Sequence, residues 1–180
     1  MSNQATTRTG EKGYMTGLFR DRDSADSAYR SLRDRGYSDD DINVLMTDET
    51  RDKYYKDGDT AIADNKALEG LGTGSAIGGT LGAIIGGIAA IGTNVLLPGL
   101  GLVVWGPIAA ALAGAGAGGL TGGLVGALIG WGIPEEHAKA YEEGIKNGGT
   151  VLGVRPRSDD DASYFENEWK TNYRGESIYR

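Results

Sequence analysis

The sequence predicts an α+β fold of ferredoxin-like type, a β-α-β…α-β body into which a glycine-zipper helical hairpin is inserted. Three observations predict it: short strand-like runs in both polar parts of the chain, amphipathic helical stripes beside them, and two glycine-rich apolar runs between the two parts. The predicted divisions are a polar tail (1–13), the first half of the body with a linker (14–68), the hairpin (69–133), the second half of the body (134–157) and a C-terminal helix or tail (158–180).

The first half of the body reads as strand, helix, strand. Residues 14–19 have the residue types of a strand and are bounded by glycine and by charged residues. We expect Asp23 to cap a helix that stops at Gly36, because apolar residues recur there at helical spacing, at Ala25, Ala28, Tyr29 and Leu32. The next strand alternates, with Ile42, Val44 and Met46 on one side and Asn43 and Leu45 on the other. Residues 48–68 are polar and predict a flexible or short-helical linker.

The second half reads as helix, strand. Pro134 is expected at the first helical position, followed by two glutamates near the positive end of the helix dipole. One face of this helix is apolar, at Ala138, Tyr141 and Ile145, and residues 150–154 form the final strand of the prediction. Near the C-terminus a helical stripe of Ala162, Phe165 and Trp169 predicts a face that docks on the body.

Glycine recurs at every fourth position in both runs, and no charged residue lies between Glu69 and Glu135. Because residues four apart stack on one helix face, each run would carry a groove without side chains. We expect these rows to be the helix-packing and oligomerisation sites. The first row is Gly70, Gly74, Gly78, Gly82 and Gly86, and the second is Gly114, Gly118, Gly122, Gly126 and Gly130. Smaller parallel rows add Gly79 and Gly87, and Gly119 and Gly123.

Such rows favour a membrane hairpin. A glycine costs a helix in water about 1 kcal/mol relative to alanine, whereas small-xxx-small rows are how helices associate in lipid. Residues 70–92 and 107–131 are each long enough for a span of about 20 residues. A turn is expected at Pro98 and Gly99, with Trp105 and Trp131 near opposite interfaces. Lysines flank the apolar region and are absent from its loop, so both termini are predicted in the cytoplasm.

Two grooves on each helix suggest a second partner, and hence a homo-oligomer. The alternative is that both rows face the sibling helix in one broad contact. A second alternative, for the whole region, is a lipid-free assembly in which the hairpins form an apolar interior. A third and weaker one is a module that binds a lipid-like ligand between sheet and hairpin.

Charge and composition exclude several classes of function. A formal net charge of −7 and a pI near 4.7 disfavour a nucleic-acid partner, which requires clustered basic residues. The absence of cysteine excludes disulfides, zinc-thiolate sites and thiol catalysis. The polar N-terminus lacks the apolar core of a secretory signal, which predicts retention in the cytoplasm or on its membrane. No small-molecule substrate is indicated.

Four patterns resemble chemical sites and none is convincing. His137 beside Glu135 and Glu136 reads as a surface histidine more readily than as a catalytic dyad. The G-x-G-x-x-G of residues 114–119 lies in an apolar helical run, not after a strand. Residues 57–68 fail as a calcium loop, because isoleucine and leucine occupy the sixth and twelfth positions. The aspartate triplets 39–41 and 159–161 read as solvated helix starts. No enzyme activity, cofactor or metal is therefore predicted.

Several segments together carry a family resemblance. They are "GLFRDRDSADSAYRSLRDRGYSDDDINVLMTDETR", the glycine-zipper insertion, "GIPEEHAKAYEEGIKNGGTVLGVRP" and "FENEWKTNYRG". In this overall pattern the chain resembles the bacterial general stress protein 17M-like domain family, in the subgroup with a hydrophobic glycine-rich insert. The resemblance implies a non-enzymatic, stress-associated bacterial protein with a ferredoxin-like body, and it supplies no catalytic residues. The predicted role is self-association through the glycine rows at the cytoplasmic membrane.

Overall fold

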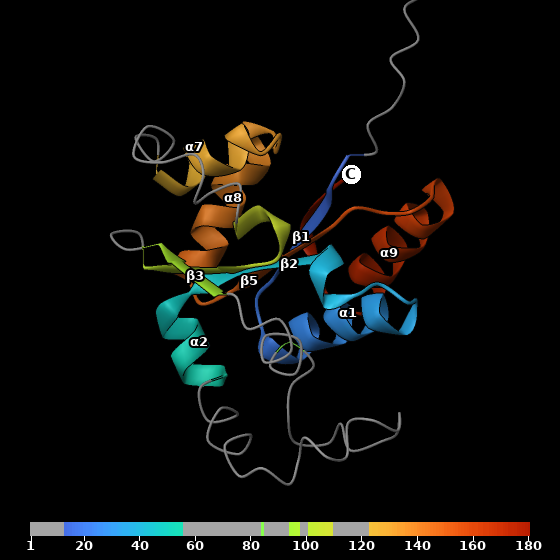
Figure 1. The fold of residues 1–180 in the computed structure, drawn as a ribbon, viewed down its shortest axis with the longest axis horizontal. Coiled ribbons are helices and arrows are strands. Elements are labelled where there is room, and N and C mark those ends of the chain that lie inside the picture. Colours follow the sequence, from blue (N-terminus) through green and yellow to red (C-terminus); the bar gives the residue numbers. More distant parts are fainter. Residues whose placement is uncertain (1–12, 56–83, 85–93, 98–100, 110–122) are drawn as a thin grey trace, which may run out of the picture.

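A computed structural model gives an α+β fold built on one antiparallel sheet (Figure 1). It describes residues 13–55, 84, 94–97, 101–109 and 123–180, and for 94–97 only the backbone. The sheet has six strands in the order β3-β4-β2-β5-β1-β6, and every neighbouring pair is antiparallel. An α+β class with short strands near both ends of the chain is therefore confirmed.

The first half of the body follows its sequence pattern closely. Strand β1 (Met15–Phe19) leads into α1 (Arg22–Asp34), and β2 (Ile42–Thr47) follows a short 3-10 turn at Asp39–Asp41. The N-cap of α1 is Asp21, not the expected Asp23, since the Asp21 carboxylate accepts the Ser24 backbone N–H at 2.8 Å. The helix ends as expected before Gly36, whose φ of +85° suits glycine. The short-helical linker prediction holds for α2 (Asp48–Tyr54), and the rest of the linker lies outside the described residues.

The second half adds α8 (Glu135–Lys146) and β5 (Thr150–Val154). Pro134 is the N-cap residue of α8, one position before the one we expected. The predicted inner face of α8 is confirmed, with Ala138, Tyr141 and Ile145 fully buried. Strand β5 is not the last, because α9 (Asp159–Thr171) and an edge strand β6 (Glu176–Tyr179) follow it. The stripe of α9 packs against the body as predicted: Ala162, Phe165 and Trp169 are buried.

Helices cover both faces of the sheet. On one face α1 and α9 pack over a core that includes Phe19, Val44 and Trp169. On the other face α8 and α7 (Gly123–Gly130) enclose a second core that includes Leu18, Leu45 and Tyr141. Figure 1 views the sheet nearly edge-on, with the two groups of helices on opposite sides of it. An α+β sheet of ferredoxin type carries its helices on one face, so the ferredoxin-like arrangement is not confirmed.

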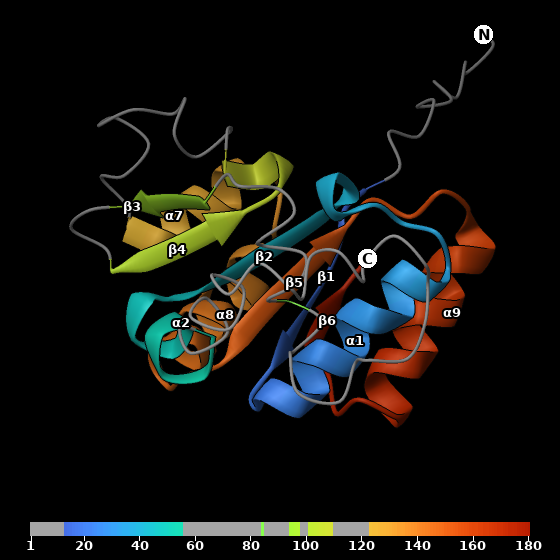
Figure 2. The same cartoon turned by 60° about the horizontal axis from the view of Figure 1, so that its bottom comes forward.

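The middle of the glycine-rich insertion is a β-hairpin in the body sheet. Strands β3 (Asn94–Leu97) and β4 (Leu102–Trp105) pair with each other, and β4 pairs with β2 from Val44↔Trp105 to Thr47↔Leu102 (Figure 2). The sequence predicts only a turn in this segment, at Pro98 and Gly99, and the described residues do not confirm a helical hairpin here. The physical reason is its β-branched and aromatic content, which suits a pleated surface.

A buried asparagine joins β4 to the body. The Asn43 side chain accepts the Ile108 backbone N–H at 2.7 Å and donates to the Gly153 carbonyl of β5 at 3.2 Å. Between β4 and Ile108 the chain turns at Gly106, whose φ is +89°. A side chain at Gly106 would overlap the Ile42 carbonyl oxygen and lie 3.0 Å from the Asn43 Cα.

We therefore expect Gly106→Ala to lower the free energy of unfolding by about 2 to 4 kcal/mol, through backbone strain and steric overlap. Urea denaturation monitored by circular dichroism would measure it. Gly130→Ala is the matched control, because a Cβ there meets nothing within 4 Å. Equal denaturation midpoints for the two variants would show that the turn after β4 is not packed against β2 in this way.

Candidate functional site

The predicted packing glycines divide between described and undescribed parts of the chain. Three of them lie on α7: Gly123, Gly126 and Gly130. The others lie outside the described residues: Gly70, Gly74, Gly78, Gly79, Gly82, Gly86, Gly87, Gly114, Gly118, Gly119 and Gly122. The G-x-G-x-x-G of residues 114–119 and the calcium-like segment 57–68 lie there as well.

Helix α7 turns its bulky side to the body and its glycine row away from it. Leu124 and Leu128 are buried in the α8-side core, in one cluster with Leu102 and Val104 of β4. On the opposite side Gly126 is half-buried, Gly130 is exposed, and a Cβ on Gly130 would meet nothing within 4 Å. Ile129, on the same outer side, is 43% exposed. Gly130 and Ile129 thus form an exposed surface at the C-terminal end of α7.

One residue of the first run, Ile84, is also described, and it is fully buried. It belongs to the core beneath α1, on the face of the sheet opposite α7. Its backbone N–H donates to the Asp26 carboxylate at 3.3 Å. At these residues the two runs lie on opposite faces of the sheet, so the described contacts do not confirm that the runs pack against each other as sibling helices.

Asp26 is the least expected polar group of this contact. It lies on α1 and is only 7% exposed, and Arg22 one turn earlier approaches it at 3.4 Å. Burial raises the pKa of the Asp26 carboxyl, and the Ile84 N–H, Arg22 and the more distant Arg30 only partly oppose this. The one signal in the sequence is that Arg22 and Asp26 are four residues apart on a helix.

Of the two tryptophans expected near membrane interfaces, one lies in the protein core. Trp105 is 1% exposed and lies in the α1-side core. Trp131 packs against Tyr14, with ring centroids 4.4 Å apart. The expectation that Trp105 lies near a lipid interface is wrong, because β4 turns its side chain into the sheet core. In the part of the chain that the structure describes, no helix has both the length and the apolar character needed to cross a membrane.

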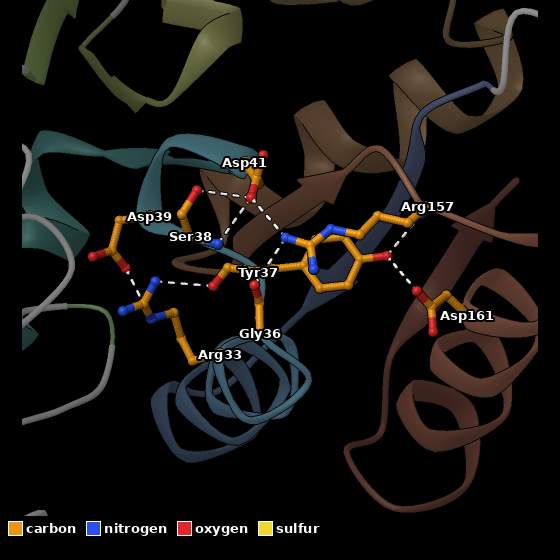
Figure 3. Close-up of polar contacts among 8 residues, drawn as sticks. All are labelled: Arg33, Gly36, Tyr37, Ser38, Asp39, Asp41, Arg157 and Asp161. Atoms are coloured by element: carbon orange, nitrogen blue, oxygen red, sulfur yellow. Dashed lines mark hydrogen bonds and ion pairs between the residues drawn. The ribbon is translucent and has the colours of Figure 1, made fainter. Parts of the chain in front are cut away.

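Members of the two aspartate triplets, Asp39, Asp41 and Asp161, lie near Tyr37 and pair with arginines (Figure 3). The Tyr37 hydroxyl donates to Asp161 at 2.8 Å and accepts the Arg157 backbone N–H at 2.8 Å. The Arg157 guanidinium lies 4.2 Å from the Tyr37 ring centroid and donates to the Asp41 carboxylate at 3.3 Å.

Further ion pairs complete this cluster. Asp161 pairs with Arg35 at 2.6 Å and Asp39 with Arg33 at 3.2 Å. Hydrogen bonds from Arg35 and Tyr37 lower the pKa of Asp161, and those from Ser38 lower the pKa of Asp41. Among the described residues, no group of three or more His, Cys, Asp or Glu side chains is arranged to hold a metal ion. The cluster ties the end of α1 and the 3-10 turn to the start of α9.

His137 ties α8 to the edge strand β6. Its Nδ1 lies 3.0 Å from the Ser177 carbonyl oxygen, and because a carbonyl only accepts, Nδ1 carries the proton. Tyr141 donates to the same carbonyl at 2.7 Å and bonds the Thr16 hydroxyl at 2.8 Å. The nearest carboxylate to His137 is Glu136 at 3.7 Å. The expected surface histidine is thus a partly buried contact between two elements.

Comparison of the chain with protein-family models, with curated proteins and with solved structures finds no match. The resemblance to the general stress protein 17M-like family therefore stays a prediction from the sequence pattern.

The raised pKa of Asp26 has a testable effect on stability. A carboxyl whose pKa is higher in the folded state than in the unfolded state makes folding more favourable as the pH falls through that pKa. Asparagine keeps an oxygen that can accept the Ile84 N–H and carries no charge. We therefore expect Asp26→Asn to be more stable than the wild type at pH 7, by a margin that shrinks as the pH is lowered. Urea denaturation of both proteins over a pH series would measure the margin.

Asp23→Asn is the matched control, because Asp23 is exposed in the first turn of the same helix. It should lose a little stability at pH 7 through the helix dipole, by about 0.5 kcal/mol. An Asp26→Asn protein that is less stable than the wild type at pH 7 would show that the Arg22 pair outweighs the burial of the charge.

Proposed function

We propose that the protein is a non-enzymatic, self-associating protein of the bacterial stress response, whose glycine rows pack against those of other copies. The observation that carries the proposal is the orientation of α7, which is anchored to the body by Leu124 and Leu128 and leaves Gly130 exposed. The stress association rests on the family resemblance alone.

An outward glycine row is costly unless something packs on it. Each glycine weakens a helix by up to about 1 kcal/mol relative to alanine, and an alanine at Gly130 would meet no neighbour. Within the described part of the chain, the body therefore gives no steric reason for glycine at this position. Close approach of another helix backbone does give one, because a side chain would hold the two helices apart.

Copies of the chain could associate in either of two environments. The first is the cytoplasmic membrane, with both termini in the cytoplasm, as the length and glycine content of the runs suggest. The second is an assembly without lipid, and two contacts favour it. Strand β4, between the runs, pairs with β2, and Ile84, within the first run, is buried beneath α1. A two-span hairpin would instead place β4 on the far side of the bilayer from the body, and Ile84 inside the bilayer.

The glycine row is tested at Gly130, which is exposed and has open space around its Cβ position. Gly130→Leu adds a bulky side chain where the single chain has room for it, so the fold should be unaffected. If the row packs against another helix, association should weaken at least tenfold, which corresponds to about 1.4 kcal/mol. Sedimentation velocity over a concentration series would measure it. Lys139→Leu, on the exposed side of α8, is the control for an added surface leucine. Equal association of the two variants would contradict the proposal.

Fractionation of bacteria that contain the native protein would separate the two places. We expect an assembly that sediments without lipid and leaves the membrane pellet on an alkaline carbonate wash. Retention in the washed membrane would instead identify an integral protein, and would mean that the contacts of β4 and Ile84 belong to another state of the chain.

A further inference from the structure

The two edges of the sheet differ in how they are protected. Strand β6 is irregular, since its pairing with β1 shifts register between Thr16 and Leu18, and Ser177 has a left-handed φ of +47°. Its rim is charged, with an ion pair of 2.7 Å between Arg20 and Glu176. Irregular backbone and charge are features that keep an edge strand from pairing with another chain.

Strand β3, at the opposite edge, has none of these features. Its sequence is Asn-Val-Leu-Leu, without charge, proline or glycine. It pairs with β4 in an unbroken register, from Asn94↔Trp105 to Leu97↔Leu102. Among the described strands, none pairs with its other side. Alternate residues of such a strand direct their N–H and C=O groups outward, where they form a template for one more strand.

The outward surface of α7 lies at this same edge. Helix α7 packs beside α8 and shares a core cluster with Leu102 and Val104 of β4, the strand next to β3. Figures 1 and 2 both place α7 near the β3–β4 end of the sheet. With α8 on one flank and β4 beneath, the exposed Ile129 and Gly130 lie on sides of α7 that neither neighbour covers. An edge strand that no other described strand pairs with, and the exposed end of α7, therefore lie at the same end of the sheet.

We propose that β3 pairs antiparallel with β3 of a second copy of this chain, which makes a continuous sheet across a two-fold axis. An axis of this kind is perpendicular to the sheet and keeps each face on its own side. The α7 helices of both copies then lie on the same face and flank the axis. This inference rests on the proposed self-association and specifies its geometry.

The distances suit a shared interface. Neighbouring strands are about 4.8 Å apart, so the two β4 strands, three intervals apart, lie about 14 Å from each other. Helices pack at about 8–10 Å. Two α7 helices above their β4 strands would therefore be a few ångströms farther apart than packed helices usually are. A small tilt of the helices, or a side chain between them, would close this gap. The exposed Ile129 lies on the outer side of α7.

Neither element is sufficient alone. Pairing over four residues forms only a few backbone hydrogen bonds, and each contributes little in net terms because it replaces hydrogen bonds with water. A stable interface buries about 800 Å² on each partner. The α7 surface supplies the apolar area that β3 lacks, and β3 supplies the register that a smooth glycine surface lacks.

The chain has no cysteine, so introduced thiols report this contact without background. Residues directly opposite in an antiparallel pair lie on the same face, and the two-fold axis preserves faces. One residue of β3 must therefore lie directly opposite the same residue of the second copy, with the two-fold axis between the two. Cα atoms opposite each other are about 4.5 to 5.5 Å apart, which is within disulfide range.

The experiment is mild oxidation of four single-cysteine variants of the full chain, Asn94→Cys, Val95→Cys, Leu96→Cys and Leu97→Cys, read as covalent dimer on a non-reducing gel. We expect one of them to form dimer at least five times faster than the others. An equimolar mixture of the two positions that flank it should form a mixed dimer. Glu176→Cys, on the exposed rim of β6, is the control edge and should stay monomeric on the gel.

The outcomes separate this inference from the proposed function. If the wild type associates and Gly130→Leu weakens it, but no β3 variant crosslinks faster than Glu176→Cys, the two-fold β3 contact is wrong and self-association stands. If the wild type is a monomer by native mass spectrometry at the same concentration, both are overturned. A single fast position in β3 together with the mixed dimer of its neighbours supports the two-fold contact.

Discussion

The pairing of β4 with β2 determines how the glycine-rich insertion is placed on the body. Four registered residue pairs join these strands, so the middle of the insertion is part of the sheet and cannot move independently of it. The alternation of β4 then divides its side chains between the two cores: Val103 and Trp105 enter the α1-side core, and Leu102 and Val104 enter the α8-side core. Both helical layers depend on this one strand.

Covering the sheet on both faces restricts where polar groups can lie. All five residues of β1 and of β5 are buried, so a hydroxyl or amide among the central strands needs an internal partner. Asn43 and Thr16 have such partners, in the Ile108 N–H and in the Tyr141 hydroxyl. Most charged side chains among the described residues lie at the rim, where Asp39, Asp41 and Asp161 pair with arginines. Asp26 is the one described carboxylate that is buried, at the place where Ile84 packs on α1.

The sequence predicted the body better than the insertion, for physical reasons. The faces of α1, α8 and α9 follow from helical periodicity, because a single apolar stripe identifies the side that packs. The alternation in β2 was read correctly, yet nothing local indicated that a second helical layer would also bury Leu45. The sequence did not reveal strands β3 and β4, because both are short and mostly apolar and lie between glycine-rich helical patterns, where a short strand and a buried helix look alike.

The candidate site was predicted only in outline. The spacing of Gly122, Gly126 and Gly130 indicated a smooth helix face, but spacing does not say whether lipid, a sibling helix or another copy covers it. That choice depends on tertiary neighbours, namely where Leu128 is anchored and which strand lies at the edge. Asp26 and Tyr37 were missed for the same reason, since their partners are 58 and 124 residues away, at Ile84 and Asp161.

Glycine at an exposed helix position has different consequences in lipid and in water. In lipid the backbone has no alternative to the helix, so a glycine row costs little and favours close packing. In water the same row weakens the helix, and α7, with only eight residues, is too short to be stable alone. The body offsets this weakness, because it stabilises α7 by packing against Leu124 and Leu128. A helix stabilised in this way from one side can keep glycine on the other, which leaves a surface that a second helix can approach closely.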